Sequence, residues 1–500
     1  MENNNKKIFK IIITLSVIII FILIVSMTAI FLTKAPNKKH ESNNSIQNPN
    51  EYKQMEINEI IESQTVVNNT IIEDNTVQID KRYGKIEIVW IDKQNNIIQN
   101  PLSPEINTMT PVKYSETAGE FQKTTFKDDN WYNYRDKKWA NAVDENGSYF
   151  VWIPRYAYKI IYYTDNTYNK EIGYSDSRGI LKINNNKTLT KISSNNLGLI
   201  ETGNHYIVEP AFMKDTASGY KNGGWDINLS GLWVAKYEMS MEKDGVHTDT
   251  ENQEIGNILS SDSIKAVSKP AVSSWRNITI GNSYINSFNY NRTLESHLIK
   301  NSEWGAVTYL AYSKYGLNEK AIQINKSTKY ITGGNKLESD IYNYNGYQST
   351  TGNATGIYDL AGGAYEFVAG FTNNGYEGIS QYGGSSKEED LCANYKNTKY
   401  KTVYSHIAED TGGNDYKSTY ANGNYELNST KRGEAIYETS LSGFGSDSWN
   451  TNSSFFIQQD TPFFTRGGDF GSSTSAGLFS FNSNSGKANA GETYRVVLAI

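Results

Sequence analysis

The chain has one cysteine and few histidines, which limits the chemistry that it can carry out. Cys392 stands alone among 500 residues, so no disulfide can form within the chain and no cysteine-based metal site can be assembled. The five histidines are not spaced like metal ligands, and the Gly-x-Ser-x-Gly motif of many hydrolases is missing. These absences argue against a thiol enzyme or a histidine-ligated metal enzyme, whereas composition does not exclude a hydrolytic triad.

Positive charge is also scarce. The formal net charge is −6, and beyond the first ten residues no stretch concentrates Lys or Arg. Because nucleic-acid binding requires a basic surface that neutralises phosphates, we expect no nucleic-acid partner. Aromatic residues, in contrast, are abundant, with 36 Tyr, 18 Phe and 9 Trp. Since each ring buries a large area while keeping a polar edge, this composition predicts a globular domain with an aromatic core.

One long hydrophobic run lies near the N-terminus. Residues 11–32 carry no charge, and a helix of this length can cross a hydrocarbon core of about 30 Å. We therefore predict a cytoplasmic head over residues 1–10, a transmembrane helix over residues 11–32, and a single-pass cell-membrane protein with an extracellular C-terminal domain. The alternative is a signal peptide cleaved near residues 26–29, which would make the protein secreted.

The rest of the chain divides into three parts. Residues 33–80 are polar and lack apolar periodicity, which predicts a flexible stalk. Residues 81–125 contain an alternating pattern at 85–91 and predict a small β spacer followed by a loop. Residues 126–500 carry short aromatic strand patterns between loops rich in Gly, Asn and Ser, and they predict the main extracellular domain.

One helix is expected within the main domain. Asn301 or Ser302 can cap its N-terminus, and Gly316 can end it. Apolar residues that begin with Trp304 are spaced to form an inward stripe. Few helices among many short strands predict an α+β fold.

Four segments, taken in order, resemble the formylglycine-generating enzymes, the sulfatase-modifying-factor family, whose fold is a variant of the C-type lectin fold. They are residues 231–238 (GLWVAKYE), 270–275 (PAVSSW) with 298–304 (LIKNSEW), 356–367 (GIYDLAGGAYEF), and 466–470 (RGGDF) with 494–498 (YRVVL). The stretch 129–160 is similar to the leading part of clostridial surface or phage-encoded proteins that carry this domain. The resemblance implies a C-type-lectin-like α+β domain with short strands, few helices and long loops, preceded by the transmembrane helix.

The chain departs from the family where catalysis takes place. Formylglycine generation uses two cysteines near the end of the fold, which hold copper and engage the substrate thiol. After Gly468 this sequence contains no cysteine. A related branch of the family uses iron held by histidines, which the histidines here do not match. The resemblance therefore implies a catalytically degenerate member that is not an enzyme and has neither copper nor iron.

The resemblance also implies a structural calcium site. The matching segment of the family wraps a calcium ion, which would be held here by the carboxylates of Asp359 and Glu366 and by the carbonyls of Gly362 and Ala364. Hard oxygen ligands of this kind suit calcium. The departure is Gly363, where the family usually has Asn. The alternative is that Asp359 caps a turn and Glu366 hydrogen-bonds to nearby backbone.

The C-terminal stretch is the candidate ligand-binding surface. Residues 463–500 interleave apolar framework residues with Asp, Ser, Asn and Gly, the small adaptable polar residues that binding loops use. In C-type-lectin-like proteins diversified by bacterial retroelements, the same stretch is the variable ligand face. By that resemblance the candidate ligand-binding residues are Asp469, Phe470, Ser472, Ser473, Asn482, Asn484 and Asn489. The alternative is an ordinary solvated loop.

These features together predict a membrane-anchored extracellular binding protein, similar to a receptor or an adhesin, that recognises a protein or a glycan. Abundant aromatic residues suit both kinds of partner, because sugars stack on aromatic rings and protein interfaces use the same residues as anchors. Two other functions stay open. One is a divergent oxidase of the sulfatase-modifying type, and the other is a structural surface protein or a phage-derived display protein.

Overall fold

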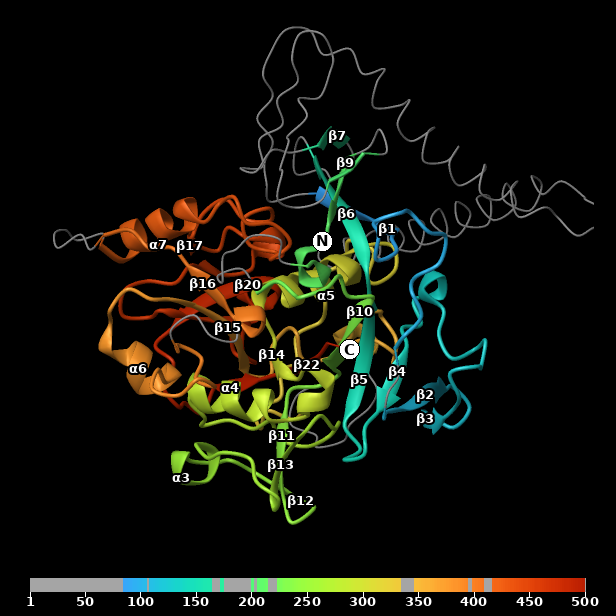
Figure 1. Ribbon diagram of the computed structural model, residues 1–500, viewed down its shortest axis with the longest axis horizontal. Coiled ribbons are helices and arrows are strands. Elements are labelled where there is room, and N and C mark those ends of the chain that lie inside the picture. The colour runs from blue at the N-terminus through green and yellow to red at the C-terminus, as the bar shows by residue number, and fades with distance from the viewer. Residues whose placement is uncertain are drawn as a thin grey trace, which may run out of the picture. The chain divides into compact units, whose positions relative to one another are not determined.

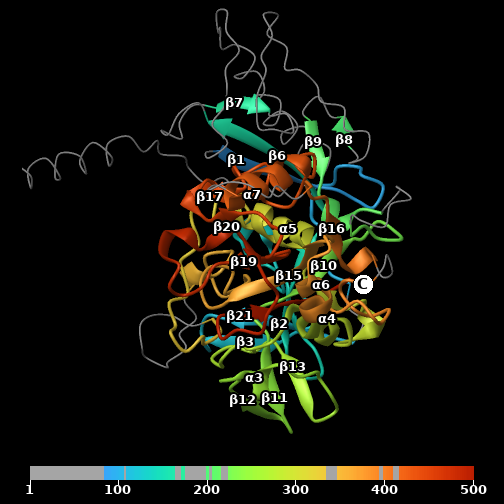
Figure 2. The ribbon, with the colours of Figure 1, turned by 90° about the vertical axis from the view of Figure 1, so that its left-hand side faces the viewer.

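The computed structural model describes residues 84–105, 108–163, 171–174, 199–201, 205–214, 223–333, 346–393, 398–408 and 416–499. All of these residues belong to one structural unit, Ser63–Ile500. Figures 1 and 2 show this unit from two directions. The predicted cytoplasmic head, residues 1–10, and the predicted stalk, residues 33–80, lie outside the described residues.

The first large sheet has seven strands, and the last described strand of the chain lies second from one edge of it. Its strands, in pairing order, are β14 (His297–Leu298), β22 (Val496–Leu498), β10 (Gly231–Ala235), β5 (Tyr149–Pro154), β4 (Asn141–Val143), β2 (Thr110–Ser115) and β3 (Glu120–Lys123). All neighbouring pairs in it are antiparallel. Residues of the predicted spacer, in β2 and β3, therefore share a sheet with residues of the predicted main domain.

The second large sheet carries most of the C-terminal part of the chain. Its strands are β16 (Thr402–Tyr404), β15 (Tyr365–Thr372), β19 (Phe463–Gly467), β20 (Gly477–Asn484), β18 (Ser454–Phe455) and β17 (Phe444–Gly445), with β21 (Glu492–Tyr494) paired to β15. The central pairs β15–β19 and β19–β20 are antiparallel, whereas β21 runs parallel to β15. Figure 2 shows these central strands close together.

Two smaller sheets complete the strand structure. The five-stranded sheet contains β1 (Gly84–Trp90), β6 (Tyr156–Tyr163), β9 (His205–Val208), β8 (Leu199–Glu201) and β7 (Glu171–Tyr174). The three-stranded sheet contains β12 (Val246–Thr248), β11 (Ser240–Lys243) and β13 (Ile264–Val267). Strand β1 pairs with β6 along its whole length, so the alternating pattern that begins the predicted spacer is also built into the main unit.

The structure corrects the fold class expected from the sequence. The described residues are rich in β-strands, with several sheets and five α-helices: α3 (Gln253–Gly256), α4 (Ile280–Phe288), α5 (Asn301–Tyr312), α6 (Glu377–Gly383) and α7 (Tyr416–Leu427). Within this described part of the chain, no helix is both long enough and apolar enough to cross a membrane. The run at 11–32 lies outside it. We therefore withdraw the transmembrane helix from the fold class, and with it the membrane anchor and the single-pass location.

Aromatic side chains fill the core between the sheets. The largest fully buried side chains include six tryptophans: Trp139, Trp152, Trp233, Trp275, Trp304 and Trp449. The first five of these donate their indole N–H groups to backbone carbonyls. Trp304, for example, donates to the carbonyl of Leu478 at 2.8 Å, and Trp275 donates to that of Gly256 at 2.8 Å. A core of large rings is therefore built without leaving these donors unpaired.

Helix α5 passes through this core, which explains how it differs from its prediction. Lys300 is its N-cap, the Glu303 carboxylate accepts from the Lys300 N–H at 2.9 Å, and the helix ends at Tyr312 instead of at Gly316. Burial opposes ionisation of Glu303, but its interactions with His297 and Lys300 hold its pKa at about 2. All twelve helix residues are buried. The predicted single inward stripe is wrong because a helix surrounded by protein has no exposed face.

At Gly305, helix α5 packs closely against the backbone around Gly433. A Cβ atom at Gly305 would collide with the carbonyl oxygen of Gly433. Gly423 in α7 is a matched control, since a Cβ atom there would meet only the flexible Cδ1 end of Ile407, at 2.6 Å.

We expect Gly305→Ala to lower the free energy of unfolding by about 1–3 kcal/mol, despite the better helix propensity of Ala, because backbone cannot move away as a side chain can. Gly423→Ala should be neutral or stabilising by up to about 1 kcal/mol. Urea denaturation of both variants measures this difference. A stabilising effect of Gly305→Ala would show that α5 is not closely packed there.

Candidate ligand-binding face

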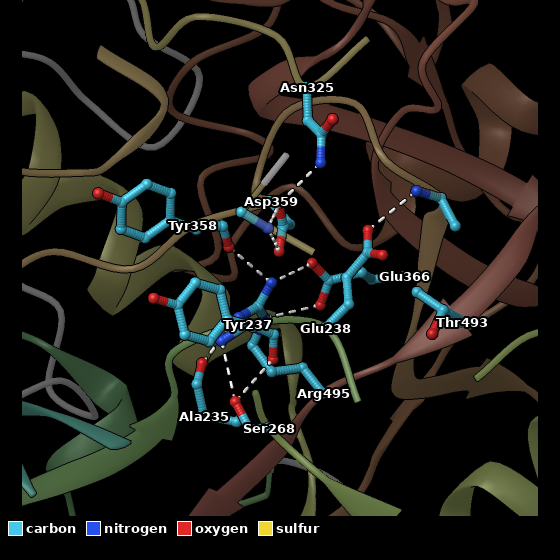
Figure 3. A network of polar contacts seen from close by, with 12 residues as sticks. Ala235, Tyr237, Glu238, Ser268, Asn325, Tyr358, Asp359, Glu366, Thr493 and Arg495 are labelled. Carbon is cyan, nitrogen blue, oxygen red and sulfur yellow. Dashed lines mark hydrogen bonds and ion pairs between the residues drawn. The ribbon is translucent and has the colours of Figure 1, made fainter. Parts of the chain in front are cut away.

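The residues predicted to hold calcium meet around an arginine. Arg495 lies between β21 and β22, and its side chain is fully buried. Its Nη2 and Nε groups donate to the two carboxylate oxygens of Glu366, at 2.6 and 2.8 Å. The same guanidinium donates to the carbonyls of Ala235 and Tyr358, at 2.7 and 2.9 Å. Figure 3 shows this network with the carboxyl groups of Glu366 and Asp359 close to the guanidinium.

Asp359 is held by N–H groups. Both of its carboxylate oxygens accept from the backbone N–H of Gly333, at 2.8 and 2.9 Å, and one also accepts from the Asn325 side-chain amide at 2.9 Å. Burial raises the pKa of Asp359, and the positive charge of Arg495 opposes that rise. Asp359, which precedes β15, therefore holds the loop that contains Asn325 and Gly333 against the sheet.

The turn between Asp359 and Glu366 makes room for a third carboxyl group, that of Glu238. Gly362 and Gly363 both adopt positive φ, and a Cβ atom at Gly363 would lie 2.5 Å from Glu238 Oε1. The Ala364 N–H donates to that same oxygen at 2.9 Å. Glycine therefore stands at position 363, where the family usually has Asn, because any side chain there would collide with Glu238. Burial, together with the neighbouring carboxylates of Asp359 and Glu366, raises the pKa of Glu238 well above its usual range.

These contacts do not fit a calcium ion. Calcium takes six to eight oxygen ligands, but both oxygens of Glu366 already accept from one guanidinium and those of Asp359 accept from N–H groups. A bound cation would also lie against the positive charge of Arg495. Among the residues that the structure describes, no three His, Cys, Asp or Glu side chains are grouped to hold a metal ion. Arg495 thus supplies the positive charge that the sequence-based prediction assigned to calcium.

Most residues predicted to bind a ligand lie where strands β19, β20 and β21 end or begin. The loop after β19 carries Asp469, Phe470 and Ser472, all half-buried. Asp469 Oδ1 accepts from the Ser472 hydroxyl at 2.6 Å and from the Gly471 N–H at 3.1 Å. The Ser472 hydroxyl also lies 2.9 Å from the hydroxyl of Tyr365, the first residue of β15. The loop is therefore tied to the central strand of the sheet.

Phe470 packs against a second tyrosine from a distant part of the chain. Its ring meets the ring of Tyr330 edge-on, with centroids 5.2 Å apart. The Arg276 guanidinium lies 4.2 Å from the centroid of the Tyr330 ring. Arg276 is itself committed to the Asp249 carboxylate at 2.9 Å and to the Ala490 carbonyl at 3.0 Å. Tyr330 therefore joins the β19–β20 loop to the segment that precedes β21.

Asn484, Asn489 and Glu492 meet beside these rings. Asn484, the last residue of β20, donates from its amide to Glu492 Oε1 at 3.0 Å. Asn489 accepts from the Gly491 N–H at 3.0 Å, and the Gly491 carbonyl accepts from the Tyr365 N–H at 2.8 Å. Glu492 is the register partner of Tyr365 across the β15–β21 pair. Residues in register on parallel strands point to the same side of a sheet, so Glu492 and Tyr365 share a side.

The structure thus brings together five of the seven predicted residues, and three further residues join them. We call this set the Tyr365 face. Its members are Tyr330, Tyr365, Asp469, Phe470, Ser472, Asn484, Asn489 and Glu492. The other two predicted residues lie beside it: Asn482 is one strand repeat from Asn484 and donates to the Ser480 hydroxyl at 3.2 Å, and Ser473 is exposed on a 3₁₀ turn, Ser473–Ser475.

Burial and nearby negative charge raise the pKa values of three residues of the Tyr365 face. Burial raises the pKa of Glu492 to about 7, the Asn484 amide opposes the rise, and the charge of Asp469 adds to it. Burial also raises the pKa of Tyr365 and of Tyr330, and both Asp469 and Glu492 contribute to each rise. A carboxyl group that titrates near neutral pH is therefore located directly behind polar loop residues.

Three members of the face were missed from the sequence, for different reasons. Tyr365 lies within the 356–367 segment, but that segment was interpreted only for its oxygen ligands. Glu492 opens the closing strand, and the alternation that places it on the side of Tyr494 could have indicated that it faces inward. Tyr330 lies in a polar stretch without strand or helix periodicity, so no sequence signal marks it.

Comparisons with known proteins add nothing to this geometry: no family model matches the chain, and no curated protein matches its sequence. The function is therefore inferred from the residues of the face and from the frame that holds them.

We predict that Arg495, and not a bound metal, stabilises the buried carboxyl groups. Arg495→Met should lower the free energy of unfolding by about 3–5 kcal/mol, because the charge of Glu366 would be left in the interior without a partner. Lys269→Met is the control. It removes the 2.6 Å pair with Glu242, which is partly exposed, and should cost about 1 kcal/mol or less. Urea denaturation measures both changes.

If Arg495 takes the place of a metal, removing calcium should not change the thermal stability of the protein. The thermal midpoint of the wild-type protein should be equal in EDTA and in millimolar calcium, because the oxygens of Glu366 and Asp359 are already engaged. A midpoint that rises with calcium, and does so in wild type but not in Glu366→Gln, would contradict this interpretation.

The burial of Glu492 in the Tyr365 face predicts how stability depends on pH. The pKa of Glu492 is raised from 4.5 to about 7 in the folded protein. The protonated carboxyl group therefore adds to the free energy of unfolding in full below pH 4.5, and this addition is lost as the pH rises through 7. Relative to Glu492→Gln, the wild-type free energy of unfolding should therefore fall by up to about 3 kcal/mol between pH 4.5 and pH 8. Denaturation of both proteins across this range tests the difference. Parallel pH curves would show that Glu492 is ionised normally.

Proposed function

We propose that this chain is a binding protein that recognises a protein or a glycan through the Tyr365 face. The observation that carries the proposal is the convergence of four chain segments. The Tyr330 bend, the start of β15, the loop after β19, and residues 484–492 place polar and aromatic side chains side by side. Asp469, Ser472, Asn484 and Phe470 stay partly exposed there.

The frame behind the face supports this proposal. Strands β15, β19 and β20 are almost entirely buried up to the point where the face begins. The side chains of the face are also held by one another, as in the contacts of Ser472 with both Asp469 and Tyr365. Side chains that are ordered before binding lose less entropy when a partner arrives. This arrangement of adaptable polar groups on a rigid frame is the one that binding loops use.

The resemblance to C-type-lectin-like domains supports the same function, since the corresponding stretch is the variable ligand face of some of those proteins. The oxidase alternative gains no support from the cysteine. Cys392 is buried, and burial raises the pKa of its thiol well above the usual range although Lys401 opposes this. A thiol that stays protonated is a poor metal ligand and a poor nucleophile.

The proposal is tested on arrays of proteins and glycans probed with the full-length chain. A ligand found there should bind the triple variant Asp469→Ala/Asn482→Ala/Asn484→Ala at least about tenfold more weakly by isothermal titration, because central contacts each contribute a kcal/mol or more. The control is Glu120→Ala/Glu426→Ala, which changes two exposed carboxylates on β3 and α7.

Two results would count against a binding function at this face. One is a ligand whose affinity is the same for wild type and the triple variant. The other is an array without ligands together with concentration-dependent self-association in size-exclusion chromatography, which would favour a structural surface protein.

A further inference from the structure

The Tyr365 face carries two acidic side chains whose charges act on each other. The charge of Asp469 raises the pKa of Glu492, and both carboxylates raise the pKa of Tyr330 and Tyr365. Among the described residues, the only cation that contributes to these three pKa shifts is Arg276, which lowers the pKa of Tyr330 and is already paired with Asp249. Within the described part of the chain, the face therefore has negative potential that its own residues do not neutralise.

The burial and hydrogen bonding of Glu492 also indicate that positive charge is needed at this face. It is 7% exposed, its Oε1 accepts from Asn484, and its Oε2 has no hydrogen-bond partner among the described residues. Its side chain points to the same side of the sheet as Tyr365, whose hydroxyl contacts the β19–β20 loop. A buried carboxylate oxygen without a partner is costly, and nearby positive charge removes most of that cost.

The aromatic residues of the face show how a cation is accommodated there. The guanidinium of Arg276 already lies 4.2 Å from the ring centroid of Tyr330, and the ring of Phe470 meets the Tyr330 ring edge-on. Aromatic faces attract cations through the ring quadrupole, and the attraction adds to that of a neighbouring carboxylate. Asp469, half-buried at the loop, is the carboxylate that a ligand reaches first.

We infer that the ligand of the Tyr365 face is a protein that presents a positively charged side chain, a lysine ammonium or an arginine guanidinium, to Asp469 beside Phe470, with Glu492 supplying a second negative charge from behind. This inference rests on the proposed binding function and narrows it to one ligand chemistry. A glycan would have to carry an amino group to meet the same requirement.

Cation binding at this face is coupled to proton release. Burial raises the pKa of Glu492 to about 7 and the charge of Asp469 adds to the rise, so around neutral pH part of this carboxyl group carries a proton that a bound cation displaces. Asp469 faces Glu492 from the loop, Tyr365 from β15 and Tyr330 from the 327–333 bend, while Arg276 is held by Asp249. With a pKa of about 7 for Glu492, an ammonium that binds only the ionised form binds about thirtyfold more weakly at pH 5.5 than at pH 8. The ammonium itself stays charged over this range.

The test uses the full-length chain and a hexalysine peptide, with the same peptide acetylated at every lysine as the neutral probe. Isothermal titration at pH 8 should show binding of hexalysine but not of the acetylated peptide. Asp469→Asn should weaken binding at least about tenfold. Glu492→Gln should bind more weakly at every pH than wild type binds at pH 5.5, because its side chain is never ionised. Titration at pH 7 in two buffers of different ionisation enthalpy should show release of about half a proton per peptide bound in wild type and none in Glu492→Gln.

Glu426→Gln, an exposed carboxylate on α7, is the matched control for general attraction between an acidic protein and a basic peptide. Equal affinity of all three variants for hexalysine, or no binding by wild type, overturns the inference. A neutral or anionic array ligand that requires Asn482 and Asn484 overturns it too but leaves the binding function standing. An amino-sugar glycan that depends on Asp469 and Glu492 replaces the protein partner with a glycan of the same chemistry.

Discussion

The buried ion pair between Arg495 and Glu366 fixes how the last strands of the chain pass from one large sheet to the other. Strand β21 belongs to the sheet of β15, and β22 belongs to the sheet of β10. Arg495 lies between these two strands and bonds to Glu366 in β15 and to the Ala235 carbonyl at the end of β10. A guanidinium can be removed from water only where such partners are in place, so this crossing tolerates few alternative arrangements.

The Tyr365 face depends on that crossing. Glu492 precedes Arg495 by three residues, and Tyr365 precedes Glu366 by one, so the pair that locks the interior also aligns the two residues behind the face. The loop with Asp469 is attached to this alignment through Ser472. The interior therefore sets the geometry of the surface, and a substitution at Arg495 should change ligand binding as well as stability.

The sequence located the important segments but did not reveal how they contact one another. Glu366 and Arg495 both lie in motif segments, yet a metal was assigned to Glu366 because no local pattern shows that residues so far apart in the chain form a pair. The same limit applies to Tyr330, which reaches Phe470 only through the fold. Prediction worked best where the signal was local, as in the acidic first turn of α5 with its Glu303. Sequence-based prediction failed along the rest of α5, because a helix that is buried on all sides has no periodic alternation of polar and apolar residues.

Buried carboxyl groups in this protein differ mainly in what surrounds them, and this difference separates structural groups from the one that we propose to contact a ligand. Glu366 has a cation and is part of the frame. Glu209, Glu238 and Glu434 each have an oxygen without a hydrogen-bond partner among the described residues, but they lie at 0%, 0% and 5% exposure within the interior. Glu492 also has such an oxygen, yet it lies directly behind half-exposed loop residues. Because these loop residues are open to solvent, a ligand can bring positive charge close to Glu492, which is why the chemistry of the proposed ligand is inferred there.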